Sequence, residues 1–94
     1  MIRSFKHKGL RKFFETGSLK GIQPTHKNRL EIILTTLNTM TNLEPLRTKS
    51  YHLHSLCGDL NGQWAVTVQA NWRITFVFDE TTKDVYIVDY QDYH

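Results

Sequence analysis

The sequence predicts an α+β fold in which two helices pack on one face of a curved antiparallel β-sheet. Up to about residue 40, apolar residues recur at the spacing of a helix face, and from Tyr51 onward they recur at every second position. The predicted order of elements is β-α-α-β-β-β-β. This order leaves the second face of the sheet without helices.

The first half of the chain predicts one short strand and two helices. Residues 2–6 form the strand. A helix over residues 8–15 follows and ends at Gly17, because glycine readily adopts the left-handed conformation that terminates helices. A second helix begins at Pro24 or Thr25. The apolar faces of the two helices consist of Leu10, Phe13 and Phe14, and of Leu30, Ile33, Leu34, Leu37 and Met40.

The second half predicts four strands over residues 51–54, 64–69, 72–78 and 85–90, with a tight turn at Ala70-Asn71. The large apolar side chains of these strands must meet the helices. Alternation then places the intervening residues on the uncovered face. These residues are His52, His54, Thr67, Gln69, Arg73 and Thr75.

Length and composition restrict the class of protein. A chain of 94 residues suits one domain over residues 1–94, and 39% hydrophobic with 22% charged residues is typical of a globular protein. No apolar run approaches the roughly 20 residues that span a membrane, and the first residues lack a signal-peptide pattern. The lone Cys57 cannot form an internal disulfide. We therefore expect a cytoplasmic protein that does not associate with membranes.

Positive charge is concentrated in the first half. Residues 1–50 hold ten lysines and arginines against three acids, whereas residues 51–94 hold two against six. This asymmetry favours a phosphate-rich or acidic partner, although solvated basic helix faces give the same pattern. The candidate RNA-binding residues of the first strand and first helix are Arg3, Lys6, Lys8, Arg11 and Lys12.

Groups suited to proton transfer occur at His54, Arg73, Asp92, Tyr93 and His94. Alternation places the first two on the uncovered face, and the end of the last strand can bring the other three to the same side. One group would remove the proton of a ribose 2′-hydroxyl while another protonates the departing 5′ oxygen. The arginine would hold the phosphate, and the tyrosine would stack on a base or bind a phosphate.

Structural interpretations of the same residues stay open. The histidines can be surface residues, and we expect His7, His26 and His52 to have no role beyond surface or backbone contacts. Arg73 can form an ion pair with Asp89 or Asp92, and Tyr93 can cap the sheet edge. A metal site built from His54, Cys57, Asp92 and His94 fits no zinc spacing, so neither a metal nor a cofactor is expected.

Four segments of the chain resemble the HigB toxins of the RelE/ParE superfamily of bacterial toxin–antitoxin systems. They are residues 2–10, residues 53–59, residues 70–76, which contain Asn71-Trp72-Arg73, and residues 89–94, which end in Asp-Tyr-His. The resemblance implies a RelE-like microbial ribonuclease fold. It also implies a ribosome-dependent mRNA endonuclease that cleaves translated messages in the ribosomal A site.

The resemblance further implies a HigA-type antitoxin, and a toxin–antitoxin complex that binds its own operator DNA. The implied catalytic residues are His54, Arg73, Asp92, Tyr93 and His94. The family has a lysine three residues after the first histidine, whereas Cys57 occupies that place here. A thiol cannot supply a fixed positive charge, so either activity is reduced or another basic residue compensates.

Two further functions stay open. ParE-type relatives share the fold but act on DNA gyrase instead of cleaving RNA. The loss of the lysine at Cys57 also leaves room for an inactive toxin that is kept only as an antitoxin-binding corepressor.

Overall fold

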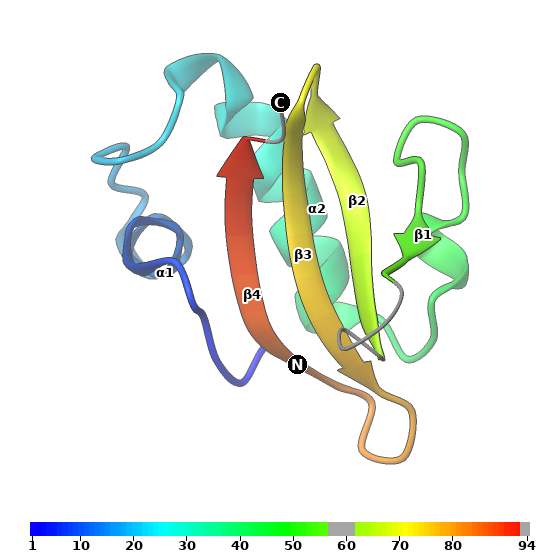
Figure 1. Ribbon diagram of the computed structural model, residues 1–94. Helices are drawn as coiled ribbons and strands as arrows, with labels where there is room; N and C mark the ends of the chain where they lie inside the picture. Colours follow the sequence, from blue (N-terminus) through cyan, green and yellow to red (C-terminus); the bar gives the residue numbers. More distant parts are fainter. Residues whose placement is uncertain (57–61, 93–94) are drawn as a thin grey trace.

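The structure is a computed structural model that describes residues 1–56 and 62–92. It contains helices α1 (Lys8–Thr16) and α2 (Lys27–Thr39) on one side of an antiparallel sheet (Figure 1). The strands are β1 (His54–Ser55), β2 (Gln63–Gln69), β3 (Trp72–Asp79) and β4 (Asp84–Asp92), in the spatial order β1-β2-β3-β4. The predicted α+β fold is confirmed.

The two helices begin and end for local reasons. The Nδ1 atom of His7 accepts a hydrogen bond of 2.9 Å from the amide of Leu10 and thereby caps α1. Gly17 ends α1 in the left-handed conformation, with φ at 79°, as predicted. A 3₁₀ turn over Pro24–His26 precedes α2.

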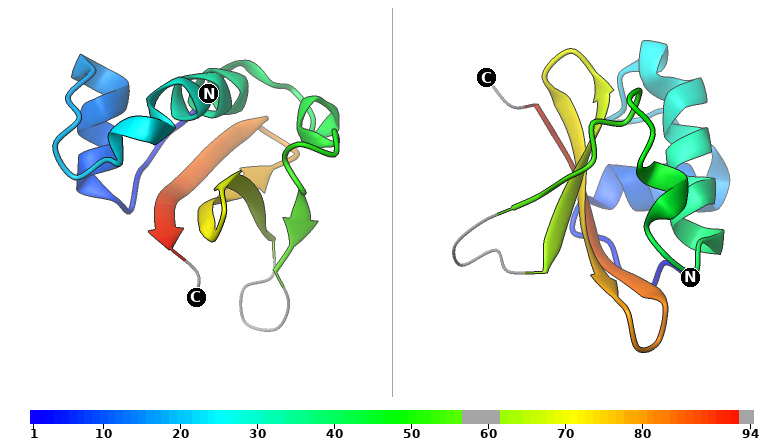
Figure 2. Two further views of the ribbon diagram at one scale, coloured as in Figure 1. Left: turned by 90° about the horizontal axis from the view of Figure 1, so that it is seen from above. Right: turned by 90° about the vertical axis from the view of Figure 1, so that its right-hand side faces the viewer.

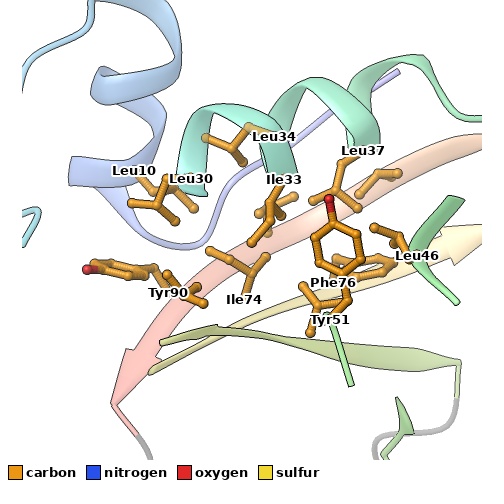
Figure 3. Close-up of a cluster of buried hydrophobic side chains, with 14 of the residues drawn as sticks. Leu10, Leu30, Ile33, Leu34, Leu37, Leu46, Tyr51, Ile74, Phe76 and Tyr90 are labelled. Atoms are coloured by element: carbon orange, nitrogen blue, oxygen red, sulfur yellow. The ribbon is translucent and has the colours of Figure 1, made fainter. Parts of the chain in front are cut away.

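The core lies between α2 and the face of β2, β3 and β4 that points toward it (Figure 3). Aliphatic side chains of α2 meet alternate residues of β3, and α1 adds two more buried side chains from its own apolar face. The fully buried side chains include Leu10, Leu30, Ile33, Leu37, Val66, Ile74, Phe76 and Val88. The helical and strand periodicities of the sequence are therefore both satisfied by one core.

The predicted first strand is present only as isolated bridges. Residues 2–6 run parallel to β4 and pair with it at Val85 and Val88. Because these two residues are three apart, they break the two-residue repeat of a continuous ladder. The prediction of a full strand over residues 2–6 was therefore wrong.

A bulge in β4 causes this irregularity. Ile87 has a positive φ of 47°, a conformation that is rare for a β-branched residue, and the register with β3 shifts between Thr75 and Val77. Val85, Val88 and Tyr90 consequently point to the core, while Ile87 remains 41% exposed. The strict alternation predicted for this strand was wrong beyond Tyr86.

The predicted strand over residues 51–54 is also shorter than expected. Tyr51 and His52 belong to turns that close on Thr48 and Lys49, and His52 has a φ of 48°. Pairing with β2 begins only at His54. In the described part of the chain, no helix is long and apolar enough to cross a membrane.

Candidate functional site

The sheet face away from the helices, which we call the open face, is built from two rows of cross-strand neighbours. One row joins His54, Ala65, Thr75 and Asp89, and the next joins Thr67, Arg73 and Gln91. Directly paired residues of antiparallel strands point to the same face. His54 and Arg73 therefore share the open face, as their positions in the sequence predicted.

The open face lies between two projecting segments. In the left view of Figure 2, β1 and the carboxyl end of β4 extend away from the helices on either side of the central strands. The floor between them is buried although no helix covers it: Ala65, Thr75 and Asp89 are all at most 9% exposed. The surrounding polar side chains are consequently arranged around a recessed floor.

His54 is held in one tautomer. Its Nδ1 atom lies 2.8 Å from the carbonyl oxygen of His52. A carbonyl can only accept, so Nδ1 carries a proton in this contact, and in the neutral ring the lone pair lies on Nε2. An exposed imidazole with this tautomer can accept a proton from a hydroxyl group.

Arg73 is half-buried and keeps part of its hydrogen-bonding capacity. Its Nη1 atom donates to the carbonyl oxygens of Ala70, at 2.7 Å, and Trp72, at 3.3 Å. Within residues 1–56 and 62–92 it forms no ion pair with a carboxylate. The ion-pair interpretation is therefore not realised there, and the remaining donors of the guanidinium group can bind an anion.

Asp89 forms hydrogen bonds with its neighbours in β4 and, among the described residues, no ion pair with Arg73. Its carboxylate accepts hydrogen bonds from the backbone amide of Tyr90, at 2.9 Å, and from the side-chain amide of Gln91. Both side chains reach the open face because the bulge at Ile87 shifts the alternation of β4 by one residue. Neither Asp89 nor Gln91 was predicted to belong to the site, since nothing in the sequence signals that bulge.

Asp92 lies at the end of β4 and is exposed. It pairs with Trp72, so the register assigns it to the face of Tyr90 and not to that of Arg73. Alternation alone therefore does not carry Asp92 onto the open face, which differs from the prediction. Tyr93, His94 and Cys57 lie outside the described residues, so their expected roles stay predictions.

A buried aromatic cluster lies beneath the end of β4. Burial raises the pKa of Tyr90; the Gln23 amide opposes this change and the charge of Asp92 adds to it. The Tyr90 ring stacks on Trp72 with a centroid distance of 4.5 Å. His26 is only 3% exposed and lies with Nδ1 at 2.7 Å from the Tyr90 hydroxyl. The expectation that His26 makes only surface or backbone contacts was therefore wrong, because its ring is buried and contacts the Tyr90 side chain.

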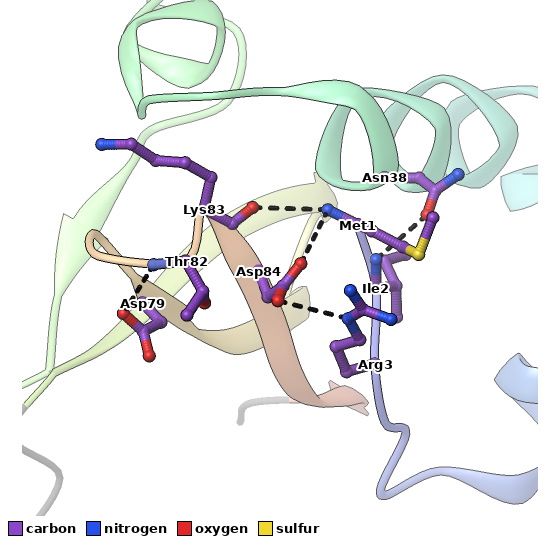
Figure 4. Close-up of polar contacts among 8 residues, drawn as sticks. All are labelled: Met1, Ile2, Arg3, Asn38, Asp79, Thr82, Lys83 and Asp84. Carbon is purple, nitrogen blue, oxygen red and sulfur yellow. Dashed lines mark hydrogen bonds and ion pairs between the residues drawn. The ribbon is translucent and has the colours of Figure 1, made fainter.

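The candidate RNA-binding residues fall into different environments. Arg3 pairs with Asp84 at 3.2 Å (Figure 4), and Arg11 pairs with Glu15 at 3.3 Å. Lys6 lines a pocket of about 170 Å³ on the open face, together with Thr75, Asp89 and Gln91. Lys6, which the sequence placed in the first strand, therefore lies beside the open face, where Thr75 and Asp89 belong to the row of His54 and Gln91 to the row of Arg73. The other members of this set, Lys8 and Lys12, are exposed on α1.

Asp84 is stabilised in its charged form. Burial alone would raise its pKa, but the hydrogen bond and charge of Arg3, a hydrogen bond from Thr82 and the charge of the terminal amine together lower that pKa. The terminal amine of Met1 lies 3.6 Å from the carboxylate (Figure 4). This carboxylate therefore fastens residues 1–3 to the start of β4.

The fold matches that of a known protein. The crystal structure of YafQ from E. coli strain BL21(DE3) is similar with a TM-score of 0.60, over 98% of this chain and 91% of that chain. The sequence identity of 16% means that this likeness shows the fold alone. By its architecture the chain falls in the class of small α+β proteins that have two helices on a four-stranded antiparallel sheet.

Sequence comparison narrows this class. Residues 3–94 match the family described as the RelE-like toxin of the type II toxin–antitoxin system HigB. The chain is also 46% identical over 94 residues to Endoribonuclease HigB of Proteus vulgaris, covering 100% of both sequences. The chain therefore belongs to the HigB-like family of RelE-like toxins. A toxin of a type II system has an antitoxin as its partner.

Proposed function

We propose that this toxin is an endoribonuclease that cleaves mRNA on the ribosome, in the A site, and thereby inhibits translation. The observation that carries the proposal is the placement of His54 and Arg73 on one open face, in neighbouring rows of the sheet. An imidazole that accepts a proton and a guanidinium group that binds the phosphate are the two functions that transfer of an RNA phosphodiester requires. The relative from Proteus vulgaris is itself named an endoribonuclease.

In the proposed reaction, Nε2 of His54 removes the proton from the ribose 2′-hydroxyl. The 2′ oxygen attacks phosphorus, a 2′,3′-cyclic phosphate forms, and the bond from phosphorus to the 5′ oxygen breaks in line with the attack. Arg73 stabilises the negative charge that grows on the non-bridging oxygens. His54 is assigned as the base because the contact of its Nδ1 atom with the carbonyl oxygen of His52 leaves Nε2 as the site that accepts a proton in the neutral ring.

The end of the chain supplies the remaining groups. We assign His94 as the acid that protonates the departing 5′ oxygen and Tyr93 as the residue that holds a base or a phosphate. Asp92 is assigned an orienting or electrostatic role. Its position at the exposed end of β4, next in the sequence to the two residues assigned above, supports this assignment.

Partners follow from the same proposal. The exposed lysines Lys8 and Lys12 favour contact with ribosomal RNA, which is rich in phosphate. We propose that a HigA-type antitoxin neutralises the toxin and that their complex binds operator DNA through the antitoxin.

The experiment that tests this function is a cleavage assay on ribosomes programmed with a defined mRNA. The proposal predicts cuts at a fixed position in the A-site codon, mapped by primer extension, and no cuts when ribosomes are omitted. His54→Ala should abolish the cuts. Ser55→Ala is the matched control, because Ser55 is the exposed neighbour in β1 on the other face.

Two results would overturn the proposal. One is an absence of codon-aligned cuts with the wild-type protein. The other is full cleavage by His54→Ala. Growth arrest without cleavage would instead favour a ParE-like poison, and antitoxin binding without any toxicity would favour an inactive corepressor.

A further inference from the structure

A second pocket lies beside β1 and has no place in the reaction described above. It has a volume of about 310 Å³ and is lined by Arg47, Thr48, Lys49, His52 and Leu53. Two of these five side chains are fixed cations and a third is an imidazole. Such a lining suits an anion.

The backbone holds this pocket in shape. Tyr51 and His52 donate hydrogen bonds back to Thr48 and Lys49. Arg29 donates to the carbonyl oxygen of Ser50 at 2.5 Å and stacks on the ring of Tyr51 at 4.5 Å. The pocket is therefore preformed and does not need to fold around its ligand, which lowers the entropic cost of binding.

His52 has an unusual backbone conformation. Its φ of 48° lies in the left-handed region, which is uncommon for a residue other than glycine. Such a conformation persists only where the surroundings impose it, and it occurs frequently at ligand-binding sites. Here it turns the chain so that residues 47–53 enclose the pocket.

The cations of the pocket are available to a ligand to different degrees. Nε of Arg47 lies 3.3 Å from Glu44, and its guanidinium carbon lies 5.9 Å from the centre of the Trp64 ring. Lys49 is exposed, and in the described part of the chain its side chain makes no ion pair or hydrogen bond. Lys49 is therefore the stronger candidate contact.

The pocket is linked directly to the proposed catalytic histidine. The carbonyl oxygen of His52, which is a pocket residue, accepts the hydrogen bond that fixes the tautomer of His54. Two residues along the chain span at most about 7 Å, so an anion in the pocket lies close to the RNA at His54. This proximity favours the mRNA substrate over ribosomal RNA as the ligand.

We infer that the pocket of Arg47, Lys49 and His52 binds a backbone phosphate of the mRNA, beside the phosphate that is cleaved. The inference rests on the proposed function, because it takes the RNA at His54 as its starting point. The site would hold the strand in register with the catalytic groups on the open face. It acts on binding and positioning and contributes no group to the bond that breaks.

The test uses full-length toxin and ribosomes in two states, with and without mRNA. The mRNA carries a 2′-deoxyribose at the scissile nucleotide, which prevents cleavage and allows binding to be measured. The Arg47→Gln/Lys49→Gln variant should lose about tenfold of its affinity for the programmed ribosome. Its binding to vacant ribosomes should not change, and the salt dependence of binding to the programmed ribosome should fall by about one phosphate contact.

Matched variants separate charge and folding from the site itself. Lys20→Gln/Lys27→Gln removes the same net charge from exposed positions outside the pocket and should bind as the wild type does. Lys49→Gln alone should weaken binding without disturbing the contact of Arg47 with Trp64. Arg47→Lys should retain most of the affinity, because it retains the charge.

Wild-type affinity of the double variant and of Lys49→Gln for programmed ribosomes would overturn the inference. So would an equal loss on vacant ribosomes, which would identify ribosomal RNA as the ligand. Failure of the proposed function is a different result: wild-type toxin would not cleave unmodified mRNA at all. His54→Ala should bind programmed ribosomes normally and fail to cleave.

Discussion

The His26 imidazole and the Tyr90 hydroxyl lie 2.7 Å apart although 64 residues separate them in the sequence. Their contact joins the turn before α2 to the last part of β4. Trp72 of β3 covers both rings: it stacks on Tyr90 and meets His26 edge to face. This cluster supports the last part of β4, which ends at Asp92.

Tyr90→Phe tests the importance of this contact for stability. The substitution keeps the ring but leaves the Nδ1 atom of buried His26 without its partner. We expect the free energy of unfolding in urea to fall by about 1–3 kcal/mol. Tyr86→Phe is the control, because Tyr86 is a half-buried tyrosine of the same strand. Equal stability of the two variants would show that the His26 contact contributes nothing.

The pH dependence of stability tests the ion pair of Asp84. Because the pKa of Asp84 is lowered in the folded protein, the charged form stabilises the fold. That contribution is present above the ordinary aspartate pKa and is lost as the pH falls from about 5 toward 2. Urea unfolding of Asp84→Asn should therefore show lower stability near neutral pH and a weaker decline in acid.

Glu80→Gln serves as the control for Asp84→Asn, since it removes one exposed negative charge from the same hairpin. It should keep the wild-type decline in acid. If Asp84→Asn follows the wild-type curve, the ion pair with Arg3 does not contribute to stability.

Because of the bulge at Ile87, we expect the glycine variant at this position to be more stable than the alanine variant, which is the reverse of the usual order in a strand. In an ordinary strand, glycine is less stable than alanine by about 0.5–1 kcal/mol. At Ile87, where φ is 47°, alanine retains the Cβ strain and glycine does not. Thermal or urea unfolding should therefore find Ile87→Gly more stable than Ile87→Ala. The usual order would mean that β4 is regular at this point.

Much of this architecture follows from the sequence. The spacing of apolar residues around Leu10 and Ile33 predicts both helices, and Gly17 predicts the end of α1. The turn at Ala70-Asn71 sets the pairing of β2 with β3, which places Arg73 opposite Thr67 on the open face. These features depend on local propensity and simple alternation, which a single sequence records.

The positions of the site residues in β4 depend on tertiary structure and could not be predicted from the sequence. A β-branched residue gives no local signal for a positive φ, so the bulge at Ile87 could not be predicted. That bulge exchanges the faces of the residues that follow it. Asp89 and Gln91 consequently reach the open face, and the register assigns Asp92 to the other. The burial of His26 likewise depends on packing against Trp72 and Tyr90.

Lys6 offers a test of the open face as the substrate-binding surface. It lines the pocket that also contains Thr75, Asp89 and Gln91, and we expect Lys6→Gln to slow mRNA cleavage about tenfold through loss of a phosphate contact. Lys6→Arg should retain activity. Lys20→Gln removes an exposed lysine elsewhere and should cleave normally. If Lys6→Gln cleaves mRNA at the wild-type rate, Lys6 does not contact the substrate.

The most direct test of the central claim is a double-mutant cycle on His54 and Arg73. Single-turnover cleavage of ribosome-bound mRNA would be measured for the wild type, His54→Ala, Arg73→Ala and the double variant. If both side chains act on one phosphate, each single substitution lowers the rate by at least about a hundredfold. The double variant is then hardly slower than the slower single variant. Rates that remain near wild type, or losses that simply multiply, would contradict a shared catalytic site on the open face.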